Sequence, residues 1–218
     1  LVDSEWVGLL TYSLVIGWQA EKFGENGPQS WADFWNTEAY PGTRSMFKSV
    51  SHALEAALMA DGVDPMDVNT VLRSAGGVDR AFAKLEEIAP DITVWYRGGS
   101  QAAQLMADEE IDIIQIGNGR AEALNADALK VGFTWNQGTT DADCLLVPKG
   151  APNRDNAMLV INEILSAEAQ ARMAVAISYG PVNANAFSTG LISPELAAKN
   201  NAAPDNMKNQ VVIDASFY

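Results

Sequence analysis

Two aspartates stand two residues apart in the segment QGTTDADCLLVP, directly before a hydrophobic run. In extended backbone, side chains at positions i and i+2 point to the same face, so Asp141 and Asp143 can converge on one point. Such a pair can bind a cation, supply half of a metal site, or act as paired acid and base in catalysis. A metal needs further ligands, and the only histidine, His52, has no partner at metal-ligand spacing. We predict that His52 lies on a helix surface and that the chain holds no metal.

Other patterns of reactive residues give no support for catalysis. Cys144 is the only cysteine, so it builds no disulfide framework, and no recognisable histidine base accompanies it. We predict that its side chain packs in the core. The sequence contains no G-x-S-x-G segment and no phosphate-binding G-x-x-x-x-G-K-S/T segment. It therefore indicates neither an enzyme nor a cofactor site.

Two glycine-containing turns follow segments with the pattern of strands. In WYRGGSQAAQ, Ser100 and Gln101 open a helix whose free N–H groups can hold an anion or a polar ligand group. In IGNGRAEAL, Asn118 follows a strand and Arg120 begins the next helix, where its guanidinium can bind a carboxylate. Both turns also fit ordinary strand-to-helix connections, with a helix cap in the first and a solvent-facing Arg120 in the second.

These residues need elements that position them, and the hydrophobic pattern predicts alternating strands and helices. Continuous or β-branched runs indicate strands over residues 1–18, 92–96, 111–117, 130–135 and 143–150. Helical spacing indicates helices over residues 45–62, 78–90, 100–110, 118–125, 153–166, 167–177 and 193–200. The alternation is typical of an α/β protein with a parallel sheet, in which ligands bind at loops past the carboxyl ends of the strands.

The segment SWADFWNTEAYPG, residues 30–42, concentrates four aromatic residues. Trp31 and Trp35 are spaced i, i+4 with Phe34 beside them, which suits the buried face of a short helix. Ser30 precedes the helix and can cap it. We expect this cluster to belong to the core and not to contact a ligand.

Composition limits the possible partners. The chain has 218 residues, of which 48% are hydrophobic and 19% are charged, as in a globular protein. The formal net charge of −14 argues against a nucleic-acid partner and fits a secreted or periplasmic protein. No apolar run approaches the roughly 18–20 residues of a transmembrane helix. The chain opens on a core-like strand with no signal peptide before it, so we expect an excised or proteolysed piece.

Three ordered stretches carry a family resemblance: SWADFWNTEAYPGTRSM, GGSQAAQLMADEEIDIIQIGNGRA, and the long run from DADCLLVPKGAPN to SYGPVNANA. Together they resemble the extracellular solute-binding proteins of bacterial ABC importers, most of all the spermidine/putrescine-binding type. The similarity covers about residues 5–218. It implies a type II periplasmic-binding-protein fold, with two α/β lobes joined by crossing strands and a ligand held by closure of the cleft.

The resemblance also implies how the lobes divide. Residues 1–12 would be the tail of lobe one, 13–138 lobe two, 139–187 a crossing and return to lobe one, and 188–218 the end of lobe two. Part of lobe one, about the first hundred residues of the family, would be missing. We therefore expect these 218 residues alone to bind a solute weakly or not at all.

Site residues follow from the same resemblance. Asp143 matches a carboxylate that holds a substrate ammonium, Tyr179 matches a pocket tyrosine, and Gln210 lies near a terminal glutamine that reaches the ligand. Polyamine binders carry pocket tryptophans where this chain has Gly117 and Asp141, and their second acid pair aligns with Ser49 and His52. We expect ligand-binding roles for Asp143, Tyr179, Ser100, Gln101, Asn118, Arg120, Asp141, Ser49 and Gln210.

The expected protein is thus a monomeric periplasmic receptor that delivers a small polar solute, an amine, amino acid or related metabolite, to an ABC permease of the inner membrane. A polyamine-like amine is one candidate, and a smaller zwitterion bound through Asp143 and Arg120 is another. An enzyme or a ligand-sensing domain on the same fold remains an alternative. A ferric-ion receptor is disfavoured because only one pocket tyrosine, Tyr179, is expected.

Overall fold

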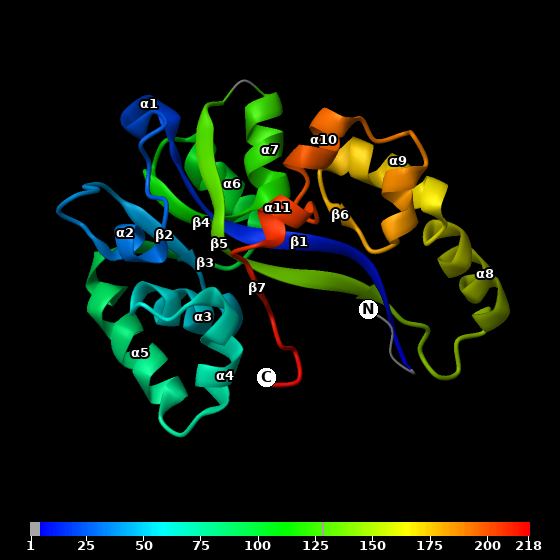
Figure 1. Ribbon diagram of the computed structural model, residues 1–218, viewed down its shortest axis with the longest axis horizontal. Helices are drawn as coiled ribbons and strands as arrows, with labels where there is room; N and C mark the ends of the chain where they lie inside the picture. The colour runs from blue at the N-terminus through cyan, green and yellow to red at the C-terminus, as the bar shows by residue number, and fades with distance from the viewer. Residues whose placement is uncertain (1–4, 128) are drawn as a thin grey trace. The chain divides into compact units, whose positions relative to one another are not determined.

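The structure is a computed structural model that describes residues 5–127 and 129–218. It divides into two compact units (Figure 1). Unit 1 comprises Leu1–Tyr12 and Asp141–Lys208, and unit 2 comprises Ser13–Thr140 and Asn209–Tyr218. The start of the predicted first strand, residues 1–4, lies outside the described residues.

The strands are β1 (Val7–Gln19), β2 (Arg44–Phe47), β3 (Ile92–Tyr96), β4 (Ile113–Gly117), β5 (Val131–Leu145), β6 (Gly180–Pro181) and β7 (Val211–Val212). Their order is β3-β2-β4-β1-β5-β7, with β6 on β1. Strand β2 runs parallel to β3 and β4, and β5 runs parallel to β7, but β1 is antiparallel to β4 and β6. The α/β alternation is confirmed, whereas the sheet is mixed and not parallel, because the long β1 enters it in the opposite direction. The run predicted at 130–135 and the first part of the run predicted at 143–150 belong to one strand, β5, which ends at Leu145, so the prediction of a strand over 146–150 is wrong.

The helices of unit 2 are α1 (Ala20–Phe23), α2 (Trp31–Trp35), α3 (Val50–Ala60), α4 (Val68–Arg73), α5 (Gly77–Ile88), α6 (Gly99–Ala107) and α7 (Asn118–Ala126), with short 3-10 turns at Pro65–Asp67 and Ala89–Asp91. Successive side chains of a strand point to opposite faces of the sheet, and the two faces pack in two separate hydrophobic cores. Ile16 and Trp18 of β1 pack with residues of α2 to α5, while Val15 packs with residues of α6 and α7. Figure 1 shows α3, α4 and α5 grouped together in this unit.

The aromatic segment has the predicted structural role. Ser30 caps α2 by accepting a hydrogen bond from the Asp33 N–H at 3.1 Å, and Trp31 and Phe34 are fully buried. Trp31 also donates from its backbone N–H and its indole N–H to Gln137, each at 2.8 Å. Since Gln137 adopts a left-handed backbone angle of φ 59°, this cluster fixes an irregular point in β5.

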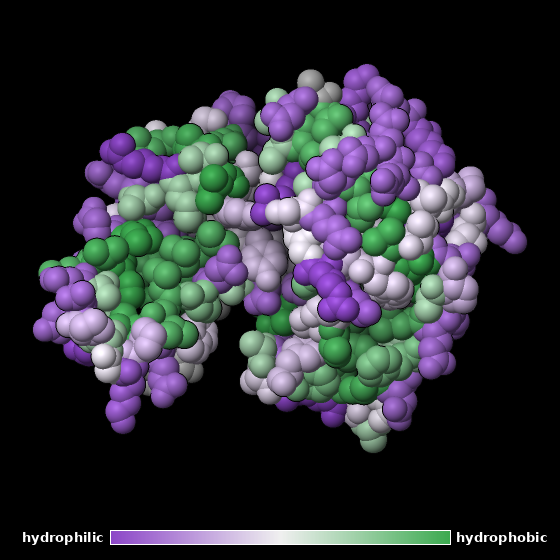
Figure 2. Space-filling model, turned by 180° about the vertical axis from the view of Figure 1, so that it is seen from behind, coloured by the Kyte–Doolittle hydropathy of each residue, from purple (hydrophilic) through white to green (hydrophobic). Residues whose placement is uncertain are grey.

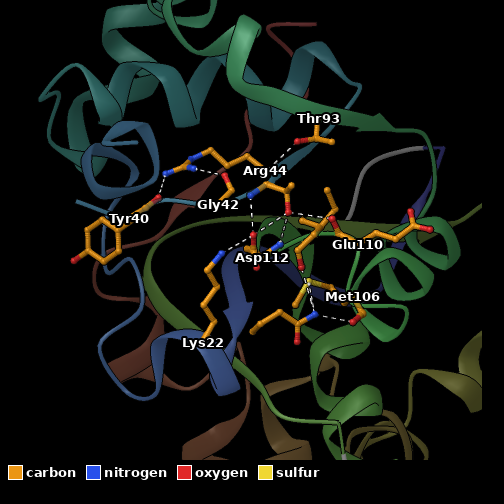
Figure 3. Close-up of polar contacts among 11 residues, drawn as sticks. Lys22, Tyr40, Gly42, Arg44, Thr93, Met106, Glu110 and Asp112 are labelled. Atoms are coloured by element: carbon orange, nitrogen blue, oxygen red, sulfur yellow. Dashed lines mark hydrogen bonds and ion pairs between the residues drawn. The ribbon is translucent and has the colours of Figure 1, made fainter. Parts of the chain in front are cut away.

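Arg44 holds the chain segment that follows α2. Its guanidinium is buried and donates to the backbone carbonyls of Phe34 (2.9 Å), Gly42 (2.7 Å) and Tyr40. Figure 3 shows this side chain reaching Tyr40 and Gly42, with the Lys22–Asp112 ion pair nearby. Because backbone oxygens compensate the buried cation, we read Arg44 as a structural residue of unit 2.

Unit 1 contains α8 (Arg154–Ile164), α9 (Ala167–Ile177), α10 (Pro194–Lys199), α11 (Pro204–Met207) and the 3-10 helix Ala184–Ser188. Ser166 caps α9 as predicted, accepting from the Ala169 N–H at 3.2 Å. Gln170 is buried and connects α9 to β1 by donating to the Leu9 carbonyl at 3.0 Å. In contrast, α8 has no buried residue, and Leu159 is 70% exposed. Figure 2 shows apolar surface in the region of this helix.

The unit boundaries place the three chain crossings after Tyr12, Thr140 and Lys208. The lobe boundaries that the resemblance implies, after residues 12, 138 and 187, stay a prediction. Ile192 shares a core with Ala171 and Ala174 of α9, which keeps the segment around Ile192 in unit 1.

Candidate functional site

One edge of the unit 2 sheet carries most of the residues singled out from the sequence. Because β2, β3 and β4 are parallel, the loops that leave their carboxyl ends emerge at the same edge. Ser49 follows β2, Ser100 and Gln101 follow β3, and Asn118 and Arg120 follow β4. The topology thus places these residues at the kind of edge where α/β proteins bind ligands.

Arg120 is an exposed cation in the first turn of α7. It lies against the start of α6, since a Cβ built on Gly99 would be 3.1 Å from the Arg120 Nε. Among the described residues, the Arg120 guanidinium has no ion-pair partner. A helix start and a guanidinium both favour negative charge, so this corner of unit 2 suits a carboxylate.

Ser100 and Gln101 lie beside it in the first turn of α6, and both are exposed. The Gln101 side-chain oxygen accepts from the Arg97 N–H at 3.0 Å, which closes the turn before the helix. The Ser100 hydroxyl makes no hydrogen bond within the described residues. Ser100 is therefore available to a ligand, whereas Gln101 already supports the turn.

Asn118 and Gln210 are buried, and both contact Ser13. The Asn118 side-chain oxygen accepts from the Ser13 N–H at 2.9 Å and so extends the contact between β1 and β4. The Gln210 side-chain oxygen accepts from the hydroxyls of Ser13 at 2.7 Å and Thr140 at 2.6 Å. In this structure Asn118 thus supports the backbone of β1, and Gln210 connects the hydroxyls of Ser13 and Thr140. Their predicted contact with a ligand stays a prediction.

Ser49 precedes α3, and His52 forms a kink near the start of this helix together with Ser51. The hydroxyls of Ser49 and Ser51 lie 3.0 Å apart, and His52 adopts a left-handed φ of 67°. The prediction that His52 lies on a helix surface is wrong: it is buried, and its Nδ1 lies 2.7 Å from the Thr139 hydroxyl. Burial lowers the pKa of His52 from 6.5 to about 4, so the imidazole is neutral at physiological pH. Sequence spacing missed this because α3 is buried on every side from His52 to Met59.

Unit 1 carries an acidic group around the second crossing. Burial and then the charge of Asp143 raise the pKa of Asp141, while a hydrogen bond from Ala142 N–H opposes the shift. Burial, followed by the charges of Asp141 and Asp143 and the nearby Tyr179, raises the pKa of Tyr12 to about 12. We call Tyr12, Asp141, Asp143 and Tyr179 the acidic group. It brings together three predicted residues and adds Tyr12, whose only sequence signal was its place in β1.

Cys144 comes directly after Asp143, and the prediction that its side chain packs in the core is wrong. Its side chain is exposed and not in the core, since the end of β5 is open to solvent at Asp143 and Cys144. Burial and then the charges of Asp141 and Asp143 raise the pKa of its thiol. At neutral pH a thiol shifted in this direction holds less of the reactive thiolate.

The chemistry open to the acidic group is cation binding. Within residues 5–127 and 129–218, no three His, Cys, Asp or Glu side chains are grouped as a metal site would need. Asp143 is exposed and forms no ion pair in that part of the chain. Like charges held close together leave an excess of negative potential, which an ammonium group would relieve.

Comparison with known proteins decides the family. A model of the bacterial extracellular solute-binding protein family matches residues 2–204. The chain belongs to this family. Its members are solute-binding proteins and not enzymes, as the sequence indicated. No helix in the described parts of the chain has the length and apolar character to cross a membrane.

Similar family members bind different solutes by name. The chain is 34% identical to the gamma-aminobutyric acid-binding protein of Pseudomonas aeruginosa, over 97% of this chain and 59% of that protein. It is 25% identical to the spermidine/putrescine-binding periplasmic protein of Escherichia coli, over 89% of this chain and 56% of the relative. Among solved structures, the Atu4243-GABA receptor is 39% identical with a TM-score of 0.85, covering 99% of this chain and 64% of that one.

These comparisons support a type II periplasmic-binding-protein fold for this family member. The chain spans less than two thirds of the length of the curated relatives that it matches. The expected spermidine/putrescine subgroup is one of two named groups of relatives, and the gamma-aminobutyric acid binder is the more similar.

Proposed function

We propose that this chain is part of the substrate-binding component of an ABC transporter, and that its solute is a small amino acid with a separated ammonium and carboxylate. The protein works in the periplasm as a monomer and delivers the solute to a permease. Capture by closure of two lobes around the solute is part of the proposal and rests on the family resemblance. The observations that carry it are made in each unit separately: an acidic group in unit 1, and in unit 2 a guanidinium that has no ion-pair partner among the described residues.

The acidic group is proposed to bind the ammonium. Burial raises the pKa of Tyr12 most, and the charges of Asp141 and Asp143 raise it further, which supports a common location for both carboxylates in unit 1. A charge-assisted hydrogen bond between an ammonium and a carboxylate stabilises a complex by roughly 1.5–3 kcal/mol. Tyr12 and Tyr179 supply phenol rings and hydroxyls that can contact the same group.

Arg120 is proposed to bind the carboxylate. Its fork of N–H donors matches a carboxylate with two parallel hydrogen bonds. The Ser100 hydroxyl and the start of α6 lie in the same part of unit 2, and both can donate to the remaining oxygen. A diamine carries no carboxylate and therefore offers Arg120 no partner.

A polyamine is the second candidate, because one named group of relatives binds spermidine and putrescine. It would use the same acidic group for one amine. At the other end, Ser49 and the buried, neutral His52 stand where polyamine binders carry acids. That end therefore offers no charge to a second ammonium, which favours the amino acid.

A series of four-carbon ligands separates the two candidates. Titration calorimetry of the full-length gene product would compare gamma-aminobutyric acid, putrescine and butyrate, which carry both groups, two ammonium groups and one carboxylate. We expect measurable affinity for gamma-aminobutyric acid and at least about tenfold weaker binding of the other two, since each lacks one charged contact.

The variant Arg120→Gln assigns the carboxylate contact. This variant should bind gamma-aminobutyric acid about tenfold or more weakly than the parent protein does, and its affinity for putrescine should be unchanged or higher. Lys48→Gln, which removes an exposed cation from the loop before α3, is the matched control. Tighter binding of putrescine than of gamma-aminobutyric acid by the parent protein would overturn the amino-acid proposal, and no binding of any of the three would overturn the solute class.

A further inference from the structure

The chain passes between the two units three times, and each passage has a polar residue on its unit 2 side. The crossings follow Tyr12, Thr140 and Lys208, so unit 2 begins or ends at Ser13, Thr140 and Asn209. Gln210 follows one residue after the third crossing. Ser13, Thr140 and Gln210 therefore lie at or next to the unit 2 ends of three segments that are far apart in sequence.

The side chains of these three residues form one buried hydrogen-bonded cluster. The hydroxyls of Ser13 and Thr140 donate to the Gln210 side-chain oxygen at 2.7 and 2.6 Å, and they lie 3.0 Å from each other. Ser13 is fully buried, and Thr140 and Gln210 are each 4% exposed. We call these three residues the crossing cluster. A buried cluster with complementary donors and acceptors fixes its members more firmly than the same groups would be fixed in water.

Backbone bonds hold the same three segments to unit 2. The Ser13 N–H donates to Asn118, the Gln137 N–H donates to the Asn209 carbonyl at 2.9 Å, and the Ile213 N–H donates to the Thr140 carbonyl at 2.8 Å. The His52 Nδ1 lies 2.7 Å from the hydroxyl of Thr139, the residue before Thr140. Strand β5 is thus fixed by contacts at successive residues up to the point where unit 2 ends.

We propose that the crossing cluster is a hinge anchor: it holds the unit 2 ends of all three crossings as one rigid point, so that changes in the orientation of the units take place on the unit 1 side. The residues directly beyond two of the crossings are Tyr12 and Asp141. Both belong to the acidic group. A cation bound there therefore contacts the residues in which the proposed hinge moves.

This inference goes beyond the proposed solute, and its first test needs no ligand. Hydrogen exchange measured by NMR would follow the amides of Ser13, Gln137 and Ile213, one in each of the three segments. The variants Ser13→Ala and Thr140→Val each remove one hydroxyl and leave these backbone groups in place. We expect either variant to accelerate exchange of all three amides by about tenfold, because a buried acceptor loses a donor and opening becomes easier.

The control is Ser45→Ala, which removes another fully buried serine hydroxyl of unit 2, hydrogen-bonded to the Val94 carbonyl at 2.6 Å. It should leave the three crossing amides unchanged. Faster exchange confined to the segment that carries Ser13→Ala or Thr140→Val would show three local contacts and would overturn the anchor.

A second measurement reports the hinge itself. Spin labels at Glu86→Cys and Glu168→Cys, in a Cys144→Ser background, place one probe on an exposed residue of each unit. Pulsed-dipolar distances should give a broader distribution in the Ser13→Ala/Thr140→Val double variant than in the parent or in Ser45→Ala. A distribution of unchanged width in a double variant with the parent's circular dichroism spectrum would reject the hinge role.

Discussion

The buried histidine makes the stability of unit 2 depend on pH. His52 is 2% exposed, and burial lowers its pKa from 6.5 to about 4. The unfolded chain binds a proton at this residue below about pH 6.5, whereas the folded chain binds one only near pH 4. Its contribution is therefore complete above the unfolded pKa and is lost as the pH falls towards the folded pKa.

The magnitude follows from the two pKa values. The gap between 6.5 and about 4 corresponds to roughly 3 kcal/mol when both forms have titrated. Between about pH 7 and about pH 5, the expected loss in the free energy of unfolding is roughly 2 kcal/mol. At a typical dependence on urea, this lowers the unfolding midpoint by about 1 M.

Urea unfolding followed by tryptophan fluorescence measures this loss, because Trp18, Trp31, Trp35, Trp95 and Trp135 all lie in unit 2. The matched variant is His52→Asn, since asparagine tolerates the left-handed φ of 67° and can bond to Thr139. Subtracting the variant's pH profile from the parent's removes the contribution of the carboxylates. Parallel profiles for the two proteins between about pH 7 and about pH 5 would refute the reasoning.

Three further predictions concern residues outside the crossing cluster. Arg44→Lys should lower the free energy of unfolding by about 3 kcal/mol, because lysine cannot satisfy the carbonyls of Phe34, Tyr40 and Gly42 together. Thermal melting measures this loss. The control is Lys22→Met, which removes an ion pair with an exposed lysine and should change the free energy of unfolding by no more than about 1 kcal/mol. The Cys144 thiol should react slowly with a disulfide reagent at neutral pH, and Asp143→Asn should accelerate it a few fold by removing a charge that raises its pKa; an equal rate would count against the acidic group. The hollow of about 590 Å³ lined by Trp6, Leu146 and Met158 should bind a hydrophobic fluorescent dye. Met158→Glu should reduce the fluorescence of the bound dye. Equal fluorescence with the variant and the parent protein would show that the dye binds elsewhere.

Local patterns predicted most of the helices, but residues 45–47, predicted as the start of a helix, form part of strand β2. The helical spacing of apolar residues and the capping positions of Ser30 and Ser166 appear in the structure as α2, α3 and α9 with these caps. The direction of β1 was not predictable in this way, because a hydrophobic run reads the same for parallel and antiparallel pairing. The mixed sheet is a tertiary property.

The sequence indicated which residue types stand near the site, but not their burial or their hydrogen-bond partners. Asp143 raises the pKa of Asp141, which fits the shared face of i and i+2 residues in a strand, while the ligand-binding roles of Asp141, Asp143 and Tyr179 stay a prediction. Spacing alone could not show that the Gln210 amide bonds to Ser13 and Thr140, because those three residues meet only in the folded sheet. A cysteine in a hydrophobic run is usually buried, but the end of β5 leaves Cys144 exposed, which its residue type alone could not show.

The affinity of Asp143→Asn for gamma-aminobutyric acid tests the central claim most directly. Calorimetry on the full-length gene product would compare this variant with the parent and with Asp155→Asn, an exposed aspartate of α8 in the same unit. Loss of one charge-assisted contact predicts an affinity lower by about tenfold to 100-fold for Asp143→Asn and no change for Asp155→Asn. Equal affinity of Asp143→Asn and the parent protein would contradict the account, because it would leave the acidic group without a role in recognising the solute.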